Sequence, residues 1–113
     1  MSFLQTHAQA NTLVVKPTQT RLDAKIALNF KEEMTALITE GNTKIVLDLS
    51  GIDFVDSSGL GAIVTCLKVL GRKGDLVISG VKNDVMTMFV LTRMDRVFQM
   101  FPSIDEAAKA LAE

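Results

Sequence analysis

The chain has 113 residues, of which 48% are hydrophobic, and this composition excludes a disordered segment and suits one globular domain with a single core. Its formal net charge of −1 gives no general attraction to nucleic acid or to anionic membranes. No apolar run approaches the ~20 residues needed to span a bilayer, no signal peptide is recognisable and one cysteine permits no internal disulfide, so we expect a cytoplasmic protein.

Apolar runs and breaking residues predict four strands that alternate with four helices. Residues 1–11 lack a clear period and are expected to form a loose lead-in to a single domain over 1–113. The strands are expected at 12–16, 44–49, 76–79 and 97–101, and the helices at about 24–40, 57–72, 84–92 and 104–111. This alternation predicts an α/β fold: a small, open, mainly parallel sheet of about four or five strands flanked by about four helices.

Capping residues mark where three of these helices begin. Asp23 is placed to cap the first helix, and either Asn83 or Asp84 is placed to cap the third. Ser103 and Glu106 have the S-x-x-E spacing of a capping box, which predicts the start of the last helix.

The junction between the central strand and the second helix is dense in small polar residues. It reads DSSGLG over Asp56–Gly61. A helix cap is the simplest role for Ser57 or Ser58, because the first helical turn has N–H groups without partners. One cap does not require an acid, two hydroxyls and two glycines, however. The unpaired N–H groups favour a negative charge, and Gly59 and Gly61 leave the backbone bare for another molecule to approach.

The run DLSGIDFVDSSGLGAI resembles the signature of STAS domains, as found in bacterial anti-sigma-factor antagonists, and the resemblance extends from Leu13 to Leu111. In that family the serine directly after the Asp of D-S-[S/T]-G-L-G is reversibly phosphorylated, which implies Ser57 as the phosphorylation site. The resemblance implies a STAS-like fold and a phosphorylation-switched, protein-binding regulator without a cofactor. The resemblance also implies that six residues take part in partner binding: Asp23, Asp56, Ser58, Gly59, Leu60 and Gly61.

The same resemblance implies the partners of the switch. The unphosphorylated form would bind an anti-sigma factor or a serine protein kinase of the partner-switching type. Phosphorylation would block that binding and a serine phosphatase would restore it, without direct contact to nucleic acid or membrane. Thr20-Arg21 stands where many members of the family have Gly-Glu, so contacts of this loop with a partner can differ here.

The residues give little support to an enzyme. Neither serine of the junction has a glycine two places before it, as a G-x-S-x-G hydrolase requires, and the sole histidine, His7, lies in the expected lead-in. Asp48, Asp53 and Asp56 are close in sequence, but turns often carry such acids, so no metal site is expected. Cys66 is expected to be a small packing residue.

Two other functions stay open. The helix start near Ser57 could hold a nucleotide phosphate or another small anion. Alternatively, the chain could be a STAS subunit of a membrane transport assembly, in which the serine is an unmodified cap.

Overall fold

A computed structural model of the chain describes residues 2–112. Five strands form the main sheet in the order β1-β2-β4-β6-β7, and two further strands, β3 and β5, form a small separate sheet. The strands are β1 (Leu4–Gln9), β2 (Thr12–Pro17), β3 (Arg21–Leu22), β4 (Lys44–Asp48), β5 (Phe54–Val55), β6 (Asp75–Ser79) and β7 (Met100–Phe101). The helices are α1 (Ala27–Thr39), α2 (Ser57–Leu70), α3 (Asn83–Leu91) and α4 (Ile104–Ala112), with short 3-10 helices η1 (Gly71–Lys73) and η2 (Met94–Arg96).

The sheet is mainly parallel, as predicted. β2, β4, β6 and β7 run parallel to one another, and β1 pairs antiparallel with β2. The predicted α/β fold, with about five strands and four helices, is therefore confirmed. Within residues 2–112, no helix has both the length and the apolar character that a membrane crossing requires.

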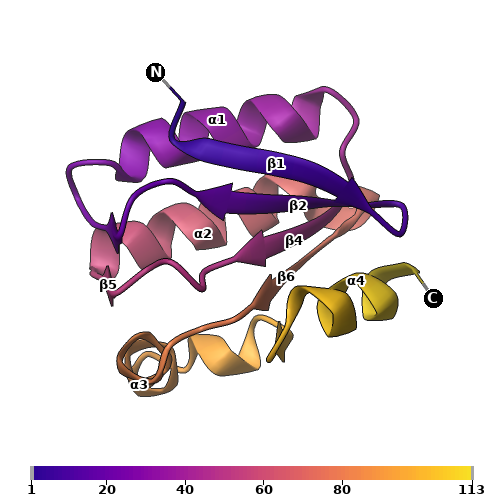
Figure 1. The fold of residues 1–113 in the computed structure, drawn as a ribbon. Helices are drawn as coiled ribbons and strands as arrows, with labels where there is room; N and C mark the ends of the chain where they lie inside the picture. Colours follow the sequence, from indigo (N-terminus) through magenta and orange to yellow (C-terminus); the bar gives the residue numbers. More distant parts are fainter. Residues whose placement is uncertain (1, 113) are drawn as a thin grey trace.

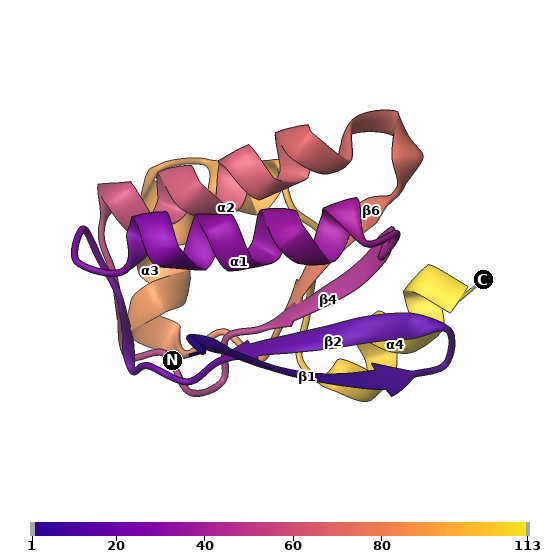
Figure 2. The ribbon, with the colours of Figure 1, turned by 90° about the horizontal axis from the view of Figure 1, so that it is seen from above.

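Helices cover both faces of the sheet (Figures 1 and 2). α1 and α2 lie side by side on one face, where their apolar side chains join those of α3 in the larger core. α4 lies on the other face and closes a smaller core. Representative buried residues of the larger core are Phe30, Met34, Ile63 and Phe89, and those of the smaller core are Val14, Val46, Val77, Ala107 and Leu111. Because the inner strands are covered twice, their side chains are apolar on both faces.

The expected loose lead-in is wrong, because residues 4–9 form strand β1. A two-residue turn at Ala10 (φ 51°) and Asn11 (φ 63°) joins it to β2, and such a pair of positive φ angles is typical of a type I′ hairpin. Two signals were missing from the sequence. The turn lacks the usual Asn-Gly or Asp-Gly pair, and Leu4 is the one fully buried residue of β1, so no alternation is visible.

The first helix begins later than predicted. α1 starts at Ala27, and its N-cap position is Ile26 rather than Asp23. Asp23 instead closes a leading turn: its carbonyl accepts from the Ala27 amide at 2.9 Å and its carboxylate accepts from the Lys25 amide at 3.1 Å. The predicted cap of the first helix by Asp23 is therefore wrong, because its carboxylate bonds within the turn that precedes α1.

Differences in the second half of the chain have local causes. The N-cap of α3 is Lys82, without a side-chain hydrogen bond, so the predicted cap at Asn83 or Asp84 is wrong. The last strand is shorter than predicted, Met100–Phe101, because the Val97 and Phe98 amides still belong to the turn that closes η2 and donate to the Met94 carbonyl at 3.0 and 3.1 Å. The capping contact at α4 is confirmed, since the Ser103 hydroxyl accepts from the Glu106 amide at 3.2 Å.

Candidate functional site at the amino end of α2

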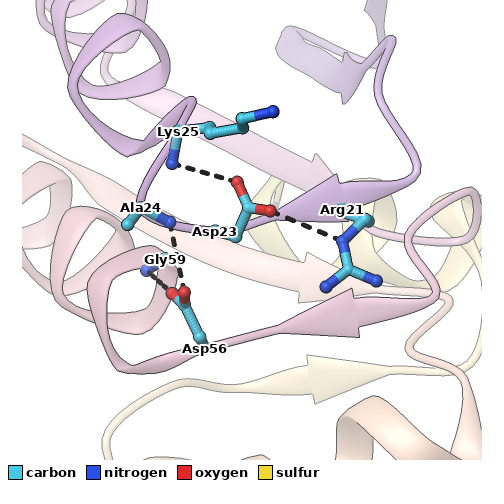
Figure 3. Close-up of polar contacts among 6 residues, drawn as sticks. All are labelled: Arg21, Asp23, Ala24, Lys25, Asp56 and Gly59. Carbon is cyan, nitrogen blue, oxygen red and sulfur yellow. Dashed lines mark hydrogen bonds and ion pairs between the residues drawn. The ribbon is translucent and has the colours of Figure 1, made fainter.

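The amino end of α2 is held by Asp56, whose carboxylate accepts two backbone hydrogen bonds (Figure 3). One oxygen accepts from the Gly59 amide at 2.9 Å and caps the helix. The other accepts from the Ala24 amide at 3.1 Å and ties α2 to the loop before α1. A serine cap is therefore ruled out here. The acid is the better choice, because its negative charge also complements the positive end of the helix dipole.

Since Asp56 is the cap, the hydroxyls of Ser57 and Ser58 are left for other uses. Both residues lie in the first turn of α2 and are exposed. Among the hydrogen bonds formed within residues 2–112, none involves either hydroxyl. The backbone N–H groups of this turn have no intrahelical partner. A negatively charged group attached or bound at this turn is therefore compatible with the helix.

The two glycines of the junction serve different purposes. Gly59 is buried, and a Cβ atom built on it would lie 2.1 Å from the Leu22 carbonyl oxygen, so glycine permits α2 to approach β3. Gly61 is exposed, and a Cβ atom there would meet nothing within 4 Å. Leu60 is 5% exposed and belongs to the core. Gly59 and Leu60 are therefore buried, whereas Gly61 lies on the surface, and the part of all three in partner binding stays a prediction.

The small sheet brings a second segment beside this helix start. Arg21 and Leu22 of β3 pair in parallel with Phe54 and Val55 of β5. The Leu22 carbonyl also accepts a hydrogen bond from the Asp56 amide at 3.3 Å. The loop before α1 and the junction before α2 thus form one surface, although they are distant in sequence.

Arg21 projects from this surface in a fixed position. Its guanidinium carbon lies 4.1 Å from the centroid of the Phe54 ring, and its Nε lies 3.4 Å from the Asp23 carboxylate. The Arg21 side chain is nevertheless 59% exposed. Phe54 does not join the core: its ring lies under Arg21, and the residue is 37% exposed. Arginine and aromatic side chains are enriched in the cores of protein–protein interfaces. Sequence reasoning noticed the unusual Arg21 but assigned it no role.

The three neighbouring acids have separate tasks. Asp48 is buried at the end of β4 and accepts from the Ser50 amide at 3.0 Å. Asp53 forms an ion pair with Lys82, and Asp56 is the helix cap. In the described part of the chain, residues 2–112, no three His, Cys, Asp or Glu side chains are grouped so as to hold a metal ion.

Cys66 and His7 lie outside this site. Cys66 is fully buried in α2, and burial raises the pKa of its thiol to about 12, so the thiol is neutral and acts in packing, as predicted. His7 lies exposed on β1, where its ring is 3.3 Å from the Gln9 side chain.

Comparisons with known proteins agree with this arrangement. The family model for the STAS domain matches residues 4–107, a range that includes β1. BtrV of Bordetella bronchiseptica, named as a candidate anti-sigma factor antagonist, is 29% identical over 85 residues, which cover 74% of this chain and 73% of BtrV.

Solved structures show the same fold. The crystal structure of TM1081 from Thermotoga maritima, described as a candidate anti-sigma factor antagonist, has a TM-score of 0.86 and 26% identity, covering 97% of this chain and 95% of that chain. The phosphorylated form of the Bacillus cell fate determinant SpoIIAA has a TM-score of 0.70 and 19% identity, covering 95% of this chain and 97% of that chain. The chain therefore belongs to the STAS domain family, and within it resembles proteins named as anti-sigma factor antagonists.

Proposed function

We propose that this chain acts in the cytoplasm as an anti-sigma factor antagonist whose binding to its partner is switched by phosphorylation of Ser57. The observation that carries the proposal is the position of the Ser57 hydroxyl: exposed, without a hydrogen bond in the described chain, on a helix capped by Asp56. Modification of this hydroxyl breaks no structural contact. SpoIIAA, which shares the fold, is known in a form described as phosphorylated.

A phosphate on Ser57 would act locally. It adds about −1.5 to −2 charges at neutral pH and three acceptor oxygens. The α2 dipole and its unpaired N–H groups accommodate that charge, so the fold persists. The same dianion lies next to the Asp56 carboxylate and projects into solvent, where it repels an acidic partner and obstructs a closely packed one. Phosphorylation would therefore reduce binding without unfolding the chain.

The partner would meet a surface made from two segments. We define the docking surface as Arg21, Phe54, Ser57, Ser58 and Gly61, all of which are exposed. The buried neighbours Gly59 and Leu60 hold α2 in place beneath it, and the carboxylates of Asp23 and Asp56 fix the loops. The partner in this proposal is an anti-sigma factor or a serine protein kinase of the partner-switching type, and a serine phosphatase returns the chain to its binding form.

Phosphosite mapping tests the modification. The chain would be isolated from its own cells and analysed by mass spectrometry with and without phosphatase treatment. A phosphatase-sensitive phosphate on Ser57 supports the proposal. Phosphate on Ser58 keeps the switch and moves the acceptor by one residue. Absence of phosphate under all growth conditions contradicts the switch and favours an anion-binding module or a transport subunit.

Binding measurements test the consequence. The partner would be captured with the Ser57→Ala chain, purified, and titrated calorimetrically against Ser57→Ala and Ser57→Asp. We expect Ser57→Ala to bind as the unmodified chain does and Ser57→Asp to bind at least tenfold more weakly, since a shift of about 1.4 kcal/mol is a factor of ten. Ser58→Ala is the matched control at a neighbouring exposed serine. Equal affinities of the alanine and aspartate variants at position 57 would refute the switch.

A further inference from the structure

We propose that β1 is a self-association edge, at which a second copy of this chain adds its own β1 in antiparallel orientation about a twofold axis at His7. The two sheets then continue into one another. This surface is built from other elements than the docking surface, so the inference does not depend on the proposed function.

The direction of the backbone groups of β1 follows from its pairing with β2. The Thr18 amide donates to the Phe3 carbonyl at 2.9 Å, and the register places Leu4 opposite Pro17, which has no N–H group. Hydrogen-bonded and non-hydrogen-bonded pairs alternate in an antiparallel ladder. The odd-numbered residues of β1 therefore bond to β2, and the N–H and C=O groups of the even-numbered residues point away from the sheet.

Two of these outward-pointing residues have no partner in the described chain. Leu4 is occupied, because the Ser2 hydroxyl donates to its carbonyl at 2.8 Å. No segment within residues 2–112 hydrogen-bonds to the outward backbone groups of Thr6 and Ala8. Figures 1 and 2 show β1 at the rim of the sheet with β2 as its single neighbouring strand.

This edge lacks the devices that normally prevent strand addition. Native edge strands are kept apart by Lys, Pro, bulges or very short length. β1 reads LQTHAQ over six residues and contains neither a charged residue nor proline, and Gln5–Ala8 are exposed. The opposite edge, β7, is only two residues long. The sheet therefore has one protected edge and one open edge.

A second copy fits this edge because the strand is complementary to itself. When Thr6 pairs with Ala8 of the second copy, the outward N–H and C=O groups of both residues are hydrogen-bonded in both copies. His7 then lies opposite His7 of the second copy, on the twofold axis. Gln5 then faces Gln9 of the second copy, whose side-chain amide donates to its own Asp105 at 2.7 Å, so no like charges meet. A groove of about 280 Å³ between β1 and α1 adjoins Thr6, and Ala8 of the second copy would lie over its mouth. A single strand pair buries less surface than the ~1,600 Å² of a standard interface. We therefore expect weak association that increases with protein concentration.

Amide hydrogen exchange tests the pairing in the wild-type chain. We expect the exchange of the Thr6 and Ala8 amides to slow as the protein concentration rises. The His7 amide, which bonds to β2, is the internal control and should exchange at the same rate throughout. Exchange of Thr6 and Ala8 that is independent of concentration, in a chain that sediments as a monomer at every concentration, overturns the proposal.

Charge exchange at the axis tests the register. His7 is exposed, so His7→Lys and His7→Glu leave the hairpin intact, but each places like charges on two directly opposed residues, whose Cα atoms lie about 4.5 Å apart in a non-hydrogen-bonded pair. In sedimentation velocity we expect the wild type and His7→Gln to approach twice the monomer mass, each charged variant to remain monomeric, and an equal mixture of the two to associate again. Matching thermal melts verify folding. Association of the charged variants alone, or no recovery in the mixture, would place the contact elsewhere and refute this edge.

Discussion

Replacing Asp56 by alanine should destabilise the chain by about 2 kcal/mol. The loss of a helix cap costs about 1 kcal/mol. The Ala24 amide loses a second hydrogen bond to the same carboxylate, and this contributes about 1 kcal/mol, below the full value for a buried charged acceptor because Asp56 is only half-buried. At the size of this chain, a change of this free energy corresponds to a fall in Tm of about 8 °C.

Asp56→Asn separates the two contacts. Its side chain has one acceptor oxygen, which can satisfy either the Gly59 amide or the Ala24 amide but not both, so we expect a loss of about 1 kcal/mol. The assay is urea unfolding followed by circular dichroism, with Asp95→Ala as a control for the loss of an exposed acid. If Asp56→Ala unfolds within 0.5 kcal/mol (roughly the range of surface substitutions) of wild type, the carboxylate does not hold the site together and our reasoning is wrong.

Four further predictions concern other positions. Gly59→Ala should be strongly destabilising, because the new Cβ meets Leu22 backbone, whereas Gly61→Ala should stabilise α2 by up to about 1 kcal/mol; urea unfolding compares the pair. Cys66 should resist alkylation at pH 8 until the chain unfolds, as followed by mass spectrometry. Folding raises the pKa of the Cys66 thiol from 9.0 to about 12, so between these pH values the thiol is deprotonated in the unfolded chain and protonated in the folded chain. The free energy of unfolding should therefore fall as the pH rises across this interval. Arg93→Gly should raise Tm, since Arg93 has a φ of 61°; an unchanged or lower Tm would show that no strain is relieved.

The parts of the fold that the sequence predicted are those set by local pattern. The buried strand around Ile45–Leu47 and the amphipathic helices follow from side-chain periodicity, and the S-x-x-E pattern located the start of α4. β1 was missed because an edge strand with one buried residue has no period to detect. The position of the candidate site was predictable because its small residues are contiguous at a strand–helix junction.

The internal arrangement of the site was less predictable, because it depends on contacts across the chain. Asp56 rather than a serine caps α2 because its second carboxylate oxygen also accepts from the Ala24 amide. Capping preferences of single residues do not predict this second contact. The burial of Gly59 and the exposure of Phe54 follow from the pairing of β3 with β5. Two-residue strands leave almost no sequence signal, so these contacts emerge only from the folded chain.

The loop before α1 is attached to the site almost entirely through main-chain atoms: the β3–β5 ladder, the Leu22 carbonyl and the Ala24 amide. Attachment of this kind does not depend on which side chains the loop carries. Arg21 can be exchanged for other residues while the loop keeps its path beside Ser57. A chain built in this way can change this one exposed residue beside the α2 junction, while the DSSGLG run and the core remain as they are.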